Sequence, residues 1–484
     1  MTFTVGDSTA REISIVPGTN VQFSVDVPLN GHSKVRVEAV DEAGNVGSRA
    51  FSVVVDRTSP ELHSLITPAL TGAADAEFFV GGRDWWEGGY GRVVGANHRV
   101  NDGPEVNTQT LAAQSGEVLA SASLREGSNT LRASAVDWAG NQSWASRGII
   151  RSEPPVQVTA KGGHSCALMR SRQLYCWGDN TSYQLGASSA GRRSGVPVRV
   201  QGLPALKAVT AGLSHTCALD VEGYAYCWGT FRDYLVVFAS WAEPRRVSET
   251  LRFEQISSGG EQSCGLTADG NAYCWGVNHS RQLGNGTSTS SMRPVAVHGG
   301  IRFSTLVAGW SSTCGIAVDD ALYCWGSVNG ATPVLAGGGM KFKSVSLGGS
   351  HACGVDIEGR GYCWGEAMGG RLGISGAGGY LVVTVPTEVS GGLRFKSIGA
   401  GSSHTCGLTV ESEIYCWGEA NHGRLGTVLQ SSPMVFFESV PIRSLRGMRF
   451  ESLSVGYTHA CALSTSGGAY CWGREEHGEL GNDP

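Results

Sequence analysis

The chain has 484 residues, which exceeds one ordinary domain and predicts two to four. Its 70 glycines and 16% charged residues favour short strands joined by tight turns, because glycine adopts positive φ without steric cost. No window shows sustained 3.6-residue apolar periodicity or an apolar run of about 18 residues, which argues against a helical protein and a membrane-spanning helix. A formal net charge of -5 without a basic cluster argues against nucleic acid as a partner.

The N-terminal third contains a repeat of its own. Residues 35–45 (VRVEAVDEAGN) align with residues 131–141 (LRASAVDWAGN), an offset of 96 residues (131 minus 35) and about the length of one β-sandwich domain. In each stretch, alternating apolar positions lead into an Asp-x-Ala-Gly-Asn turn. This pattern predicts a strand that enters a tight loop.

Both stretches resemble the bacterial Ig-like modules found in tandem on secreted and surface proteins. The resemblance implies a partial Ig-like β-sandwich over residues 1–59 and a complete one over residues 60–153. Related turns sometimes hold calcium, but we expect Asp41, Asn45, Asp137 and Asn141 to form turns. We expect no metal and no cofactor in the chain.

The C-terminal two thirds contains a second repeat, which involves every cysteine. The tripeptide Cys-Trp-Gly occurs seven times, and another cysteine stands ten residues before the cysteine of each copy. The pairs account for all 14 cysteines: Cys166 with Cys176, Cys217 with Cys227, Cys264 with Cys274, Cys314 with Cys324, Cys353 with Cys363, Cys406 with Cys416, and Cys461 with Cys471.

Each cysteine pair spans a predicted β-hairpin. In the second copy, the stretch Cys217-Ala-Leu-Asp-Val precedes the turn signal Glu222-Gly223 and a second stretch rich in strand formers. Directly opposed residues of an antiparallel pair lie about 4.5–5.5 Å apart on one face, within the reach of a disulfide. Reduced core cysteines are the alternative, whereas zinc sites use closer pairs such as C-x2-C, which the sequence lacks. Dense disulfide pairing predicts an oxidising compartment, and therefore export.

The second repeat resembles that of the RCC1 (regulator of chromosome condensation) family over residues 154–484. The third copy shows the motif as Gly260-Glu-Gln-Ser-Cys-Gly-Leu266, Ala272-Tyr-Cys-Trp-Gly276, Arg281-Gln-Leu-Gly284 and Pro294-Val-Ala-Val297. The resemblance implies an all-β, seven-bladed β-propeller with about four strands per blade. The first cysteines of neighbouring copies lie between 39 (353 minus 314) and 55 (461 minus 406) residues apart, which brackets the usual length of a blade.

A histidine stands two residues before the first cysteine in five copies, where the third and fourth copies have Gln262 and Ser312. Copies related by a ring cannot converge on one active site, so we expect these histidines to have a structural, hydrogen-bonded role rather than a catalytic one. The histidines are His164, His215, His351, His404 and His459.

Blade two departs from the repeat. Five copies carry a Leu-Gly turn after Cys-Trp-Gly, but blades two and four lack it, and blade two has the aromatic insert 230–241 (TFRDYLVVFASW) instead. Exposed aromatic loops are typical interface anchors, so we predict that Phe231, Tyr234, Phe238 and Trp241 bind a partner. The alternative is an ordinary outer strand with a variant edge.

The two ends of the chain suggest a fragment. Residues 1–7 lack the basic and apolar segments of a signal peptide, and the first Ig-like module is shorter than its period. Only six Pro-x-x-Val-type strands are visible, at Pro197, Pro244, Pro294, Pro333, Pro386 and Pro441. Because a seventh is missing, we expect the strand that closes the ring to lie beyond residue 484.

Together these features predict a secreted or cell-surface binding protein without enzymatic activity, which docks an extracellular protein or glycan and whose oligomeric state is open. One alternative, implied by the family, is guanine-nucleotide exchange or regulation of a small GTPase; the paired cysteines argue against it. A second alternative is an extracellular hydrolase, although no G-x-S-x-G, H-E-x-x-H or phosphate-loop motif occurs.

Overall fold

A computed structural model describes the chain apart from a set of short segments. The segments left out are residues 1, 6–10, 13–30, 41–45, 56–59, 87–88, 92, 110–116, 138, 140, 188–189, 234–235, 328, 377–380, 428–436 and 484. The described elements are strands, together with the 3-10 turns η2 (Gly337–Gly339), η3 (Met368–Gly370) and η4 (Asn421–Gly423). Within these described residues, no helix is long and apolar enough to cross a membrane.

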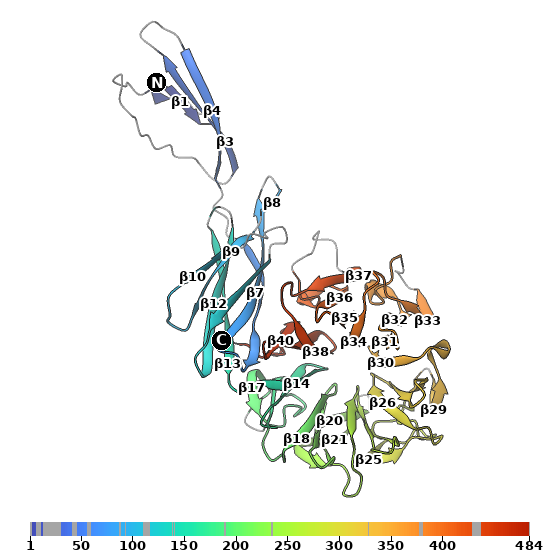
Figure 1. Cartoon of the computed structure of the whole chain (residues 1–484). Helices are drawn as coiled ribbons and strands as arrows, with labels where there is room; N and C mark the ends of the chain where they lie inside the picture. The colour runs from blue at the N-terminus through green and yellow to red at the C-terminus, as the bar shows by residue number, and fades with distance from the viewer. Residues whose placement is uncertain are drawn as a thin grey trace.

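Seven antiparallel blades surround one centre and form the β-propeller that the repeat predicts (Figure 1). Blades one to three contain β14 (Pro155–Ala160), β15 (His164–Met169), β16 (Leu174–Asp179) and β17 (Arg193–Arg199); β18 (Leu206–Ala211), β19 (His215–Asp220), β20 (Ala225–Asp233) and β21 (Val236–Arg246); and β22 (Gln255–Ser258), β23 (Gln262–Leu266), β24 (Ala272–Gly276) and β25 (Ser291–Ala296).

Blades four to six repeat this order of four strands. They contain β26 (Phe303–Ala308), β27 (Ser312–Ala317), β28 (Leu322–Gly326) and β29 (Gly330–Leu335); β30 (Phe342–Leu347), β31 (His351–Asp356), β32 (Gly361–Glu366) and β33 (Val382–Glu388); and β34 (Phe395–Ala400), β35 (His404–Thr409), β36 (Ile414–Glu419) and β37 (Phe437–Ser444). The six prolines singled out from the sequence lie in the outermost strands, where a missing N–H breaks no ladder between two partners.

All seven predicted cysteine pairs form disulfides between the two middle strands of a blade. The two cysteines of each pair are directly opposed, and their Cα atoms lie 4.0–4.1 Å apart across the set. The cysteines are nearly inaccessible to solvent, and none of them is a free thiol. Since each bond closes a short hairpin inside one blade, the disulfides staple single blades rather than join neighbours. In order from blade one to blade seven, the bonds join Cys166 to Cys176, Cys217 to Cys227, Cys264 to Cys274, Cys314 to Cys324, Cys353 to Cys363, Cys406 to Cys416, and Cys461 to Cys471.

Blade seven takes its fourth strand from the N-terminal part of the chain. Its own strands are β38 (Phe450–Val455), β39 (His459–Ser464) and β40 (Gly468–Gly473), and β6 (Pro68–Thr71) pairs antiparallel with β40. We expected the closing strand beyond residue 484. That expectation is wrong, because β6 fills the outer position of blade seven. β6 also pairs in parallel with β13 (Gln142–Arg151), which makes one continuous sheet across the expected boundary at residue 153.

Two sheets between residues 60 and 153 pack face to face. One has the order β11-β7-β5, with β8 paired to β7, and the other continues as β10-β9-β12-β13. Leu65, Phe78 and Val118 from the first sheet share a core with Leu131 and Ile149 from the second. The strands are β5 (Glu61–Ile66), β7 (Asp75–Trp86), β8 (Gly89–Gly91), β9 (Val93–Val100), β10 (Val106–Gln109), β11 (Glu117–Ser123) and β12 (Gly127–Asp137).

Residues 1–59 contribute a separate four-stranded sheet of order β2-β1-β3-β4. Its strands are β1 (Thr2–Val5), β2 (Arg11–Glu12), β3 (Gly31–Val40) and β4 (Val46–Val55). The repeated stretches 35–45 and 131–141 begin in β3 and β12, as predicted. Asp41 and Asn45 lie outside the described residues, whereas the Asp137 carboxylate accepts hydrogen bonds from the backbone N–H groups of Ala139 and Asn141, as a turn former does.

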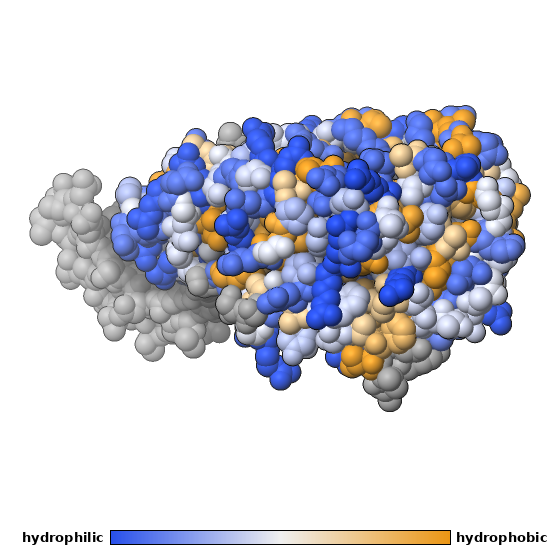
Figure 2. Space-filling view, turned by 90° about the horizontal axis from the view of Figure 1, so that it is seen from below, coloured by the Kyte–Doolittle hydropathy of each residue, from blue (hydrophilic) through white to orange (hydrophobic). Residues whose placement is uncertain are grey.

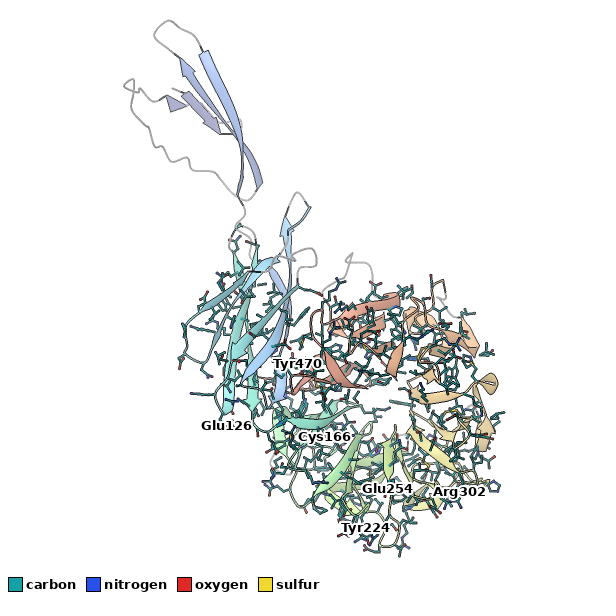
Figure 3. The ribbon with its side chains drawn as sticks, viewed as in Figure 1. Glu126, Cys166, Tyr224, Glu254, Arg302 and Tyr470 are labelled. Atoms are coloured by element: carbon teal, nitrogen blue, oxygen red, sulfur yellow. A yellow bond between two sulfur atoms is a disulfide. The ribbon has the colours of Figure 1, made fainter. Side chains whose placement is uncertain are left out.

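The two-sheet unit is joined to blade seven by packing as well as by β6. Tyr470 lies where the blue and red strands meet (Figure 3), and its hydroxyl donates to the Glu77 carbonyl oxygen at 2.9 Å. Phe79 and Met448 pack in the same core cluster as Tyr470. The C-terminal residues add Asn482, whose side chain donates to the Thr67 hydroxyl at 3.1 Å. The two-sheet unit is therefore packed against blade seven and takes part in closing the ring.

Candidate binding face

One face of the propeller carries both kinds of loop that the sequence singled out. In blade two, His215 opposes Gly229, so the Gly-x-x-His loop before β19 and the connection after Cys-Trp-Gly lie at the same edge of the sheet. The same register recurs in blade six, where His404 opposes Gly418. We call this side the loop face.

The insert of blade two forms a hairpin on the loop face. β20 and β21 remain paired beyond the level of His215, with Thr230 opposite Ser240 and Phe231 opposite Ala239. Strand β21 runs from Val236 to Arg246, so the second half of the insert and the segment around Pro244 form one continuous strand. The backbone of the insert therefore matches the alternative interpretation, an outer strand with a variant edge. What the hairpin can contact depends on its side chains.

The four predicted partner-binding residues differ in exposure. Phe231 is fully buried, 4.2 Å from His215 between ring centroids, so its side chain supports the hairpin and is not available to a partner. Phe238 is 41% exposed, and Trp241 is partly exposed beside the Arg245 guanidinium. Tyr234 lies outside the described residues. Partner binding by Phe238 and Trp241 stays a prediction.

An acidic side chain links the hairpin to blade three. Glu261, in the blade-three loop on the same face, accepts a hydrogen bond from the Arg232 backbone N–H at 2.7 Å. Burial raises the pKa of Glu261 to about 7. The hairpin is therefore held against the neighbouring blade near its turn, close to the exposed Phe238.

The repeated histidines form links between blades. His164 Nε2 lies 2.7 Å from the Thr216 hydroxyl of the next blade, and that hydroxyl donates to the Gln184 carbonyl oxygen at 2.8 Å. Since the hydroxyl proton is used on the carbonyl, the histidine nitrogen must be the donor to the hydroxyl. The Trp228 indole N–H donates to the same Gln184 oxygen at 2.9 Å. We call this set of three contacts the inter-blade latch.

The latch also closes the ring between blades seven and one. His459 Nε2 lies 2.8 Å from the Ser165 hydroxyl, and both Ser165 and the Trp177 indole donate to the Glu479 carbonyl oxygen. Burial lowers the pKa of His164 to about 4 and that of His459 to about 3, so both rings are neutral at pH 7. These contacts support the structural role predicted for the histidines.

Several blade junctions lack part of the latch, and at two of them a buried nitrogen is left without a partner among the described residues. Blade two has no Leu-Gly turn, and the buried Trp275 indole N–H of blade three has no hydrogen-bond partner among the described residues. Blade seven has Ala460 where Thr216 and Thr405 stand, and neither ring nitrogen of the buried His404 has a partner within the same set of residues. The latch is thus incomplete at Trp275 and at His404, and the junction of blades four and five, with Ser312 and Ala352, lacks its histidine and its hydroxyl.

The centre of the loop face contains a small hollow, which sequence reasoning did not single out. Its wall comes from the loops before the second strand of all seven blades. Tyr457 and Trp310, from blades seven and four, stack with ring centroids 5.1 Å apart and are 39% and 41% exposed. We call this hollow the channel mouth. The residues other than glycine that line it are Lys161, Leu213, Trp310, Leu347, Ala400, Val455 and Tyr457.

Lys161 is an exception within the channel mouth. At its position in the loop, the other six blades have glycine, namely Gly212, Gly259, Gly309, Gly348, Gly401 and Gly456. A Cβ at these glycines would come within 2.7 Å of a neighbouring atom, such as the Gly309 oxygen at 2.1 Å from Gly259. The seven-fold comparison of the loops is the signal that could have identified Lys161 from the sequence.

Apolar side chains elsewhere on the surface form small separate groups among polar ones, as one side of the molecule shows (Figure 2). The outer strands of blades four and five carry several of them, including Leu335 at 57% and Val385 at 60% exposure. These residues are spread along strand edges. The channel mouth differs because its two exposed rings contact each other and share the hollow with a lysine.

Comparison with known proteins identifies the repeat. Models of the regulator of chromosome condensation (RCC1) repeat match the C-terminal two thirds of the chain at several places. The matched residues are 173–219, 269–316 and 411–463 for one model, and 156–184, 206–233, 253–282, 395–424 and 450–479 for the other. The chain therefore contains RCC1 repeats, as the sequence motif implied.

Curated relatives match over short segments. The Arabidopsis thaliana ultraviolet-B receptor UVR8 is 33% identical over 99 residues, which is 20% of this chain and 22% of that protein. A secretion-regulating guanine nucleotide exchange factor from Bos taurus is 29% identical over 104 residues, which is 21% of this chain and 22% of that protein. The aligned segments thus span about a fifth of either relative.

Solved structures share the fold over the propeller. Prp20p from Saccharomyces cerevisiae aligns with a TM-score of 0.57 at 19% identity, covering 67% of this chain and 83% of that one. Human WBSCR16 aligns with a TM-score of 0.57 at 19% identity, covering 66% and 90% of the two chains. At these identities the likeness shows a shared seven-bladed propeller.

Proposed function

We propose that this RCC1-repeat propeller is a non-enzymatic docking module that works in an oxidising compartment, secreted or at the cell surface, and binds a protein or glycan through its loop face. The observation that carries the proposal is the set of seven disulfides, one in each blade. Reducing compartments keep such cysteines as thiols, so this full pairing favours export.

The N-terminal unit supports a presenting role. Its two packed sheets suit an Ig-like module, and β6 ties that module into blade seven by pairing with β40. We propose that the N-terminal residues hold the propeller in a fixed orientation, so that the loop face points towards a partner. The proposed boundaries are 1–59 and 60–153 for the modules and 154–484 for the propeller, with β6 shared between the last two.

Binding through loops also suits the repeat. The solved yeast relative Prp20p is described with binding properties to Gsp1p and histones, and a second structure holds Kap60 bound to it. In a propeller, the repeated core provides stability and the variable loops provide recognition, because changes in a loop have little effect on the stability of the blades. In this chain the most divergent loop is the blade-two hairpin, with Phe238 exposed beside the partly exposed Trp241.

The test is capture from the secreted and surface proteins and glycans of the source organism. The double variant Phe238→Ser with Trp241→Ser is compared with Val382→Ser with Val385→Ser, a matched control on the outer strand of blade five whose residues are 57% and 60% exposed. We expect the hairpin variant to lose most of the captured material and the control to keep it. Equal capture by both variants would remove the hairpin from the binding face.

A second function is regulation of a small GTPase, which the exchange-factor relative favours. It is tested by release of labelled GDP from small GTPases in the presence of the oxidised chain. Acceleration well above the uncatalysed rate would establish exchange activity, and we expect none.

A further inference from the structure

The channel mouth combines a cation without a partner and two exposed rings. No hydrogen bond or ion pair joins the Lys161 ammonium to another residue in the described part of the chain, whereas Lys207 is paired with Glu254 at 3.0 Å. The side chains lining the hollow include no carboxylate from the described residues. Lys161 is partly buried, and partial loss of water without a counter-ion is costly for a cation, so the site is complementary to an anion.

Lys161 and the aromatic pair belong to one local structure. The Tyr457 backbone N–H donates to the Lys161 carbonyl oxygen at 3.1 Å, which places the two residues side by side in neighbouring loops of blades seven and one. The Tyr457 ring then reaches the Trp310 ring from blade four. The aromatic pair and Lys161 therefore line the same hollow.

Backbone contacts hold this arrangement in place. Hydrogen bonds run from loop to loop around the hollow, as in Gly260 N–H to the Gly309 oxygen at 2.8 Å and Ser402 N–H to the Tyr457 oxygen at 3.1 Å. The Ser402 hydroxyl also donates to the Tyr457 oxygen, at 2.7 Å. A preorganised rim of this kind lowers the ordering cost that a ligand must meet.

We propose that the channel mouth receives a carboxylate side chain from an acidic segment of a partner protein, with Lys161 as its counter-ion and Trp310 and Tyr457 as the surrounding contact surface. The inference rests on the proposed docking function and names the chemistry of the partner. A single ammonium matches a single carboxylate. Tryptophan and tyrosine are among the residues that carry most binding energy at protein interfaces.

Burial is consistent with this role. It lowers the pKa of Lys161 to about 8, so the amine is still mainly protonated at pH 7 but titrates more readily than a surface lysine. A carboxylate beside the ammonium would favour the charged form and raise that pKa again. The amine should therefore become less reactive towards acylating reagents when an acidic ligand is bound.

The test uses the full oxidised chain and two dye-labelled peptides with amidated C-termini, (Gly-Glu)3 and its neutral counterpart (Gly-Gln)3. Lys161→Met keeps the side-chain length and removes the charge, and Lys343→Met, at an exposed lysine of β30, is the matched control. We expect the acidic peptide to bind at least tenfold more tightly than the neutral one. This preference should vanish in Lys161→Met and persist in Lys343→Met.

A second measurement keeps the result independent of weak peptide affinity. Brief acetylation at pH 8, followed by peptide mapping, should modify Lys161 in the free chain and be slowed several-fold by the acidic peptide. Equal binding of the two peptides, or an unchanged preference in Lys161→Met, would overturn the inference. Binding of polygalacturonate without binding of the acidic peptide would also overturn it. None of these results would touch partner capture by the hairpin, so the docking function would stand or fall separately.

Discussion

Supplying the missing latch partner of His404 should stabilise the propeller. In blade six, the Thr405 hydroxyl lies 2.8 Å from His351 Nε2 and donates to the Arg371 oxygen at 2.8 Å. Ala460 holds the corresponding place in blade seven, opposite Trp472, and is fully buried. The change Ala460→Thr places a hydroxyl between His404 and the Arg424 oxygen, to which the Trp472 indole already donates.

The magnitude follows from the two groups that gain partners. A buried donor left without an acceptor costs about 1–3 kcal/mol, and a formed hydrogen bond contributes about 0.5–1.5 kcal/mol net. Crowding by the added threonine methyl offsets part of the gain, so we expect about 1–2 kcal/mol of added stability. Ala460→Ser tests the same hydroxyl with less volume.

The assay is calorimetric unfolding of the oxidised protein, supported by NMR of ¹⁵N-labelled histidine. A gain of about 1 kcal/mol should raise the unfolding midpoint by roughly 1–4 °C in a protein of this size. The His404 Nε2 proton should exchange more slowly with solvent once it is hydrogen-bonded. Both readouts report on the same new contact.

The matched control is Ala352→Thr in blade five. The preceding blade has Ser312 in place of the histidine and lacks the Leu-Gly turn, so this hydroxyl gains neither latch partner. We expect the control to be neutral or destabilised. If Ala460→Thr and Ala352→Thr change the midpoint equally, or if the His404 proton exchanges as before, the reasoning about the latch is refuted.

Three further predictions concern the core of the repeat. Trp228→Phe should cost at least about 1 kcal/mol more than Trp275→Phe, because Trp228 donates to the Gln184 oxygen and the Trp275 indole has no partner among the described residues; equal losses in denaturant unfolding would contradict this. Replacing Cys217 and Cys227 together with Ala should cost about 3 kcal/mol, the chain-entropy value for a loop of about eleven residues, while the other six disulfides persist in the intact mass. The free energy of unfolding should fall as the pH drops below about 6.5. Burial lowers the folded-state pKa of His215, His351, His404 and His459 to about 3, so the unfolded chain binds protons first, and each histidine should lower the free energy of unfolding by about 2 kcal/mol at pH 5. Glu261 opposes this loss in part, because its pKa is raised in the folded state and its protonation favours folding. An unfolding midpoint that is flat between pH 7 and pH 4 would contradict the assignment of these histidines.

The propeller could be predicted because each blade repeats a local pattern. Cys217, Cys227 and the turn between them lie within one hairpin, so spacing alone predicts their register. The pairing of β6 with β40 joins residues about 400 positions apart through a four-residue strand, and no local signal marks such a contact.

The surface features of the candidate binding face could be predicted only in part. Phe238 is exposed, as the aromatic insert predicted. Phe231 is instead buried against His215, because its part of the hairpin still packs against the core of the blade. The stack of Trp310 on Tyr457 depends on ring geometry across seven blades, which a sequence does not show. Lys161 was visible as the exception among six glycines, but its meaning depends on the hollow around it.

The most direct test of the proposed compartment is thiol alkylation of the protein isolated from its own source cells, unfolded without reductant and weighed as an intact mass. We predict that none of the 14 cysteines is labelled until a reductant is added, which would place the protein in an oxidising compartment with all seven staples formed. Labelling of most cysteines before reduction would contradict this, and would direct the search towards the cytoplasm and small GTPases.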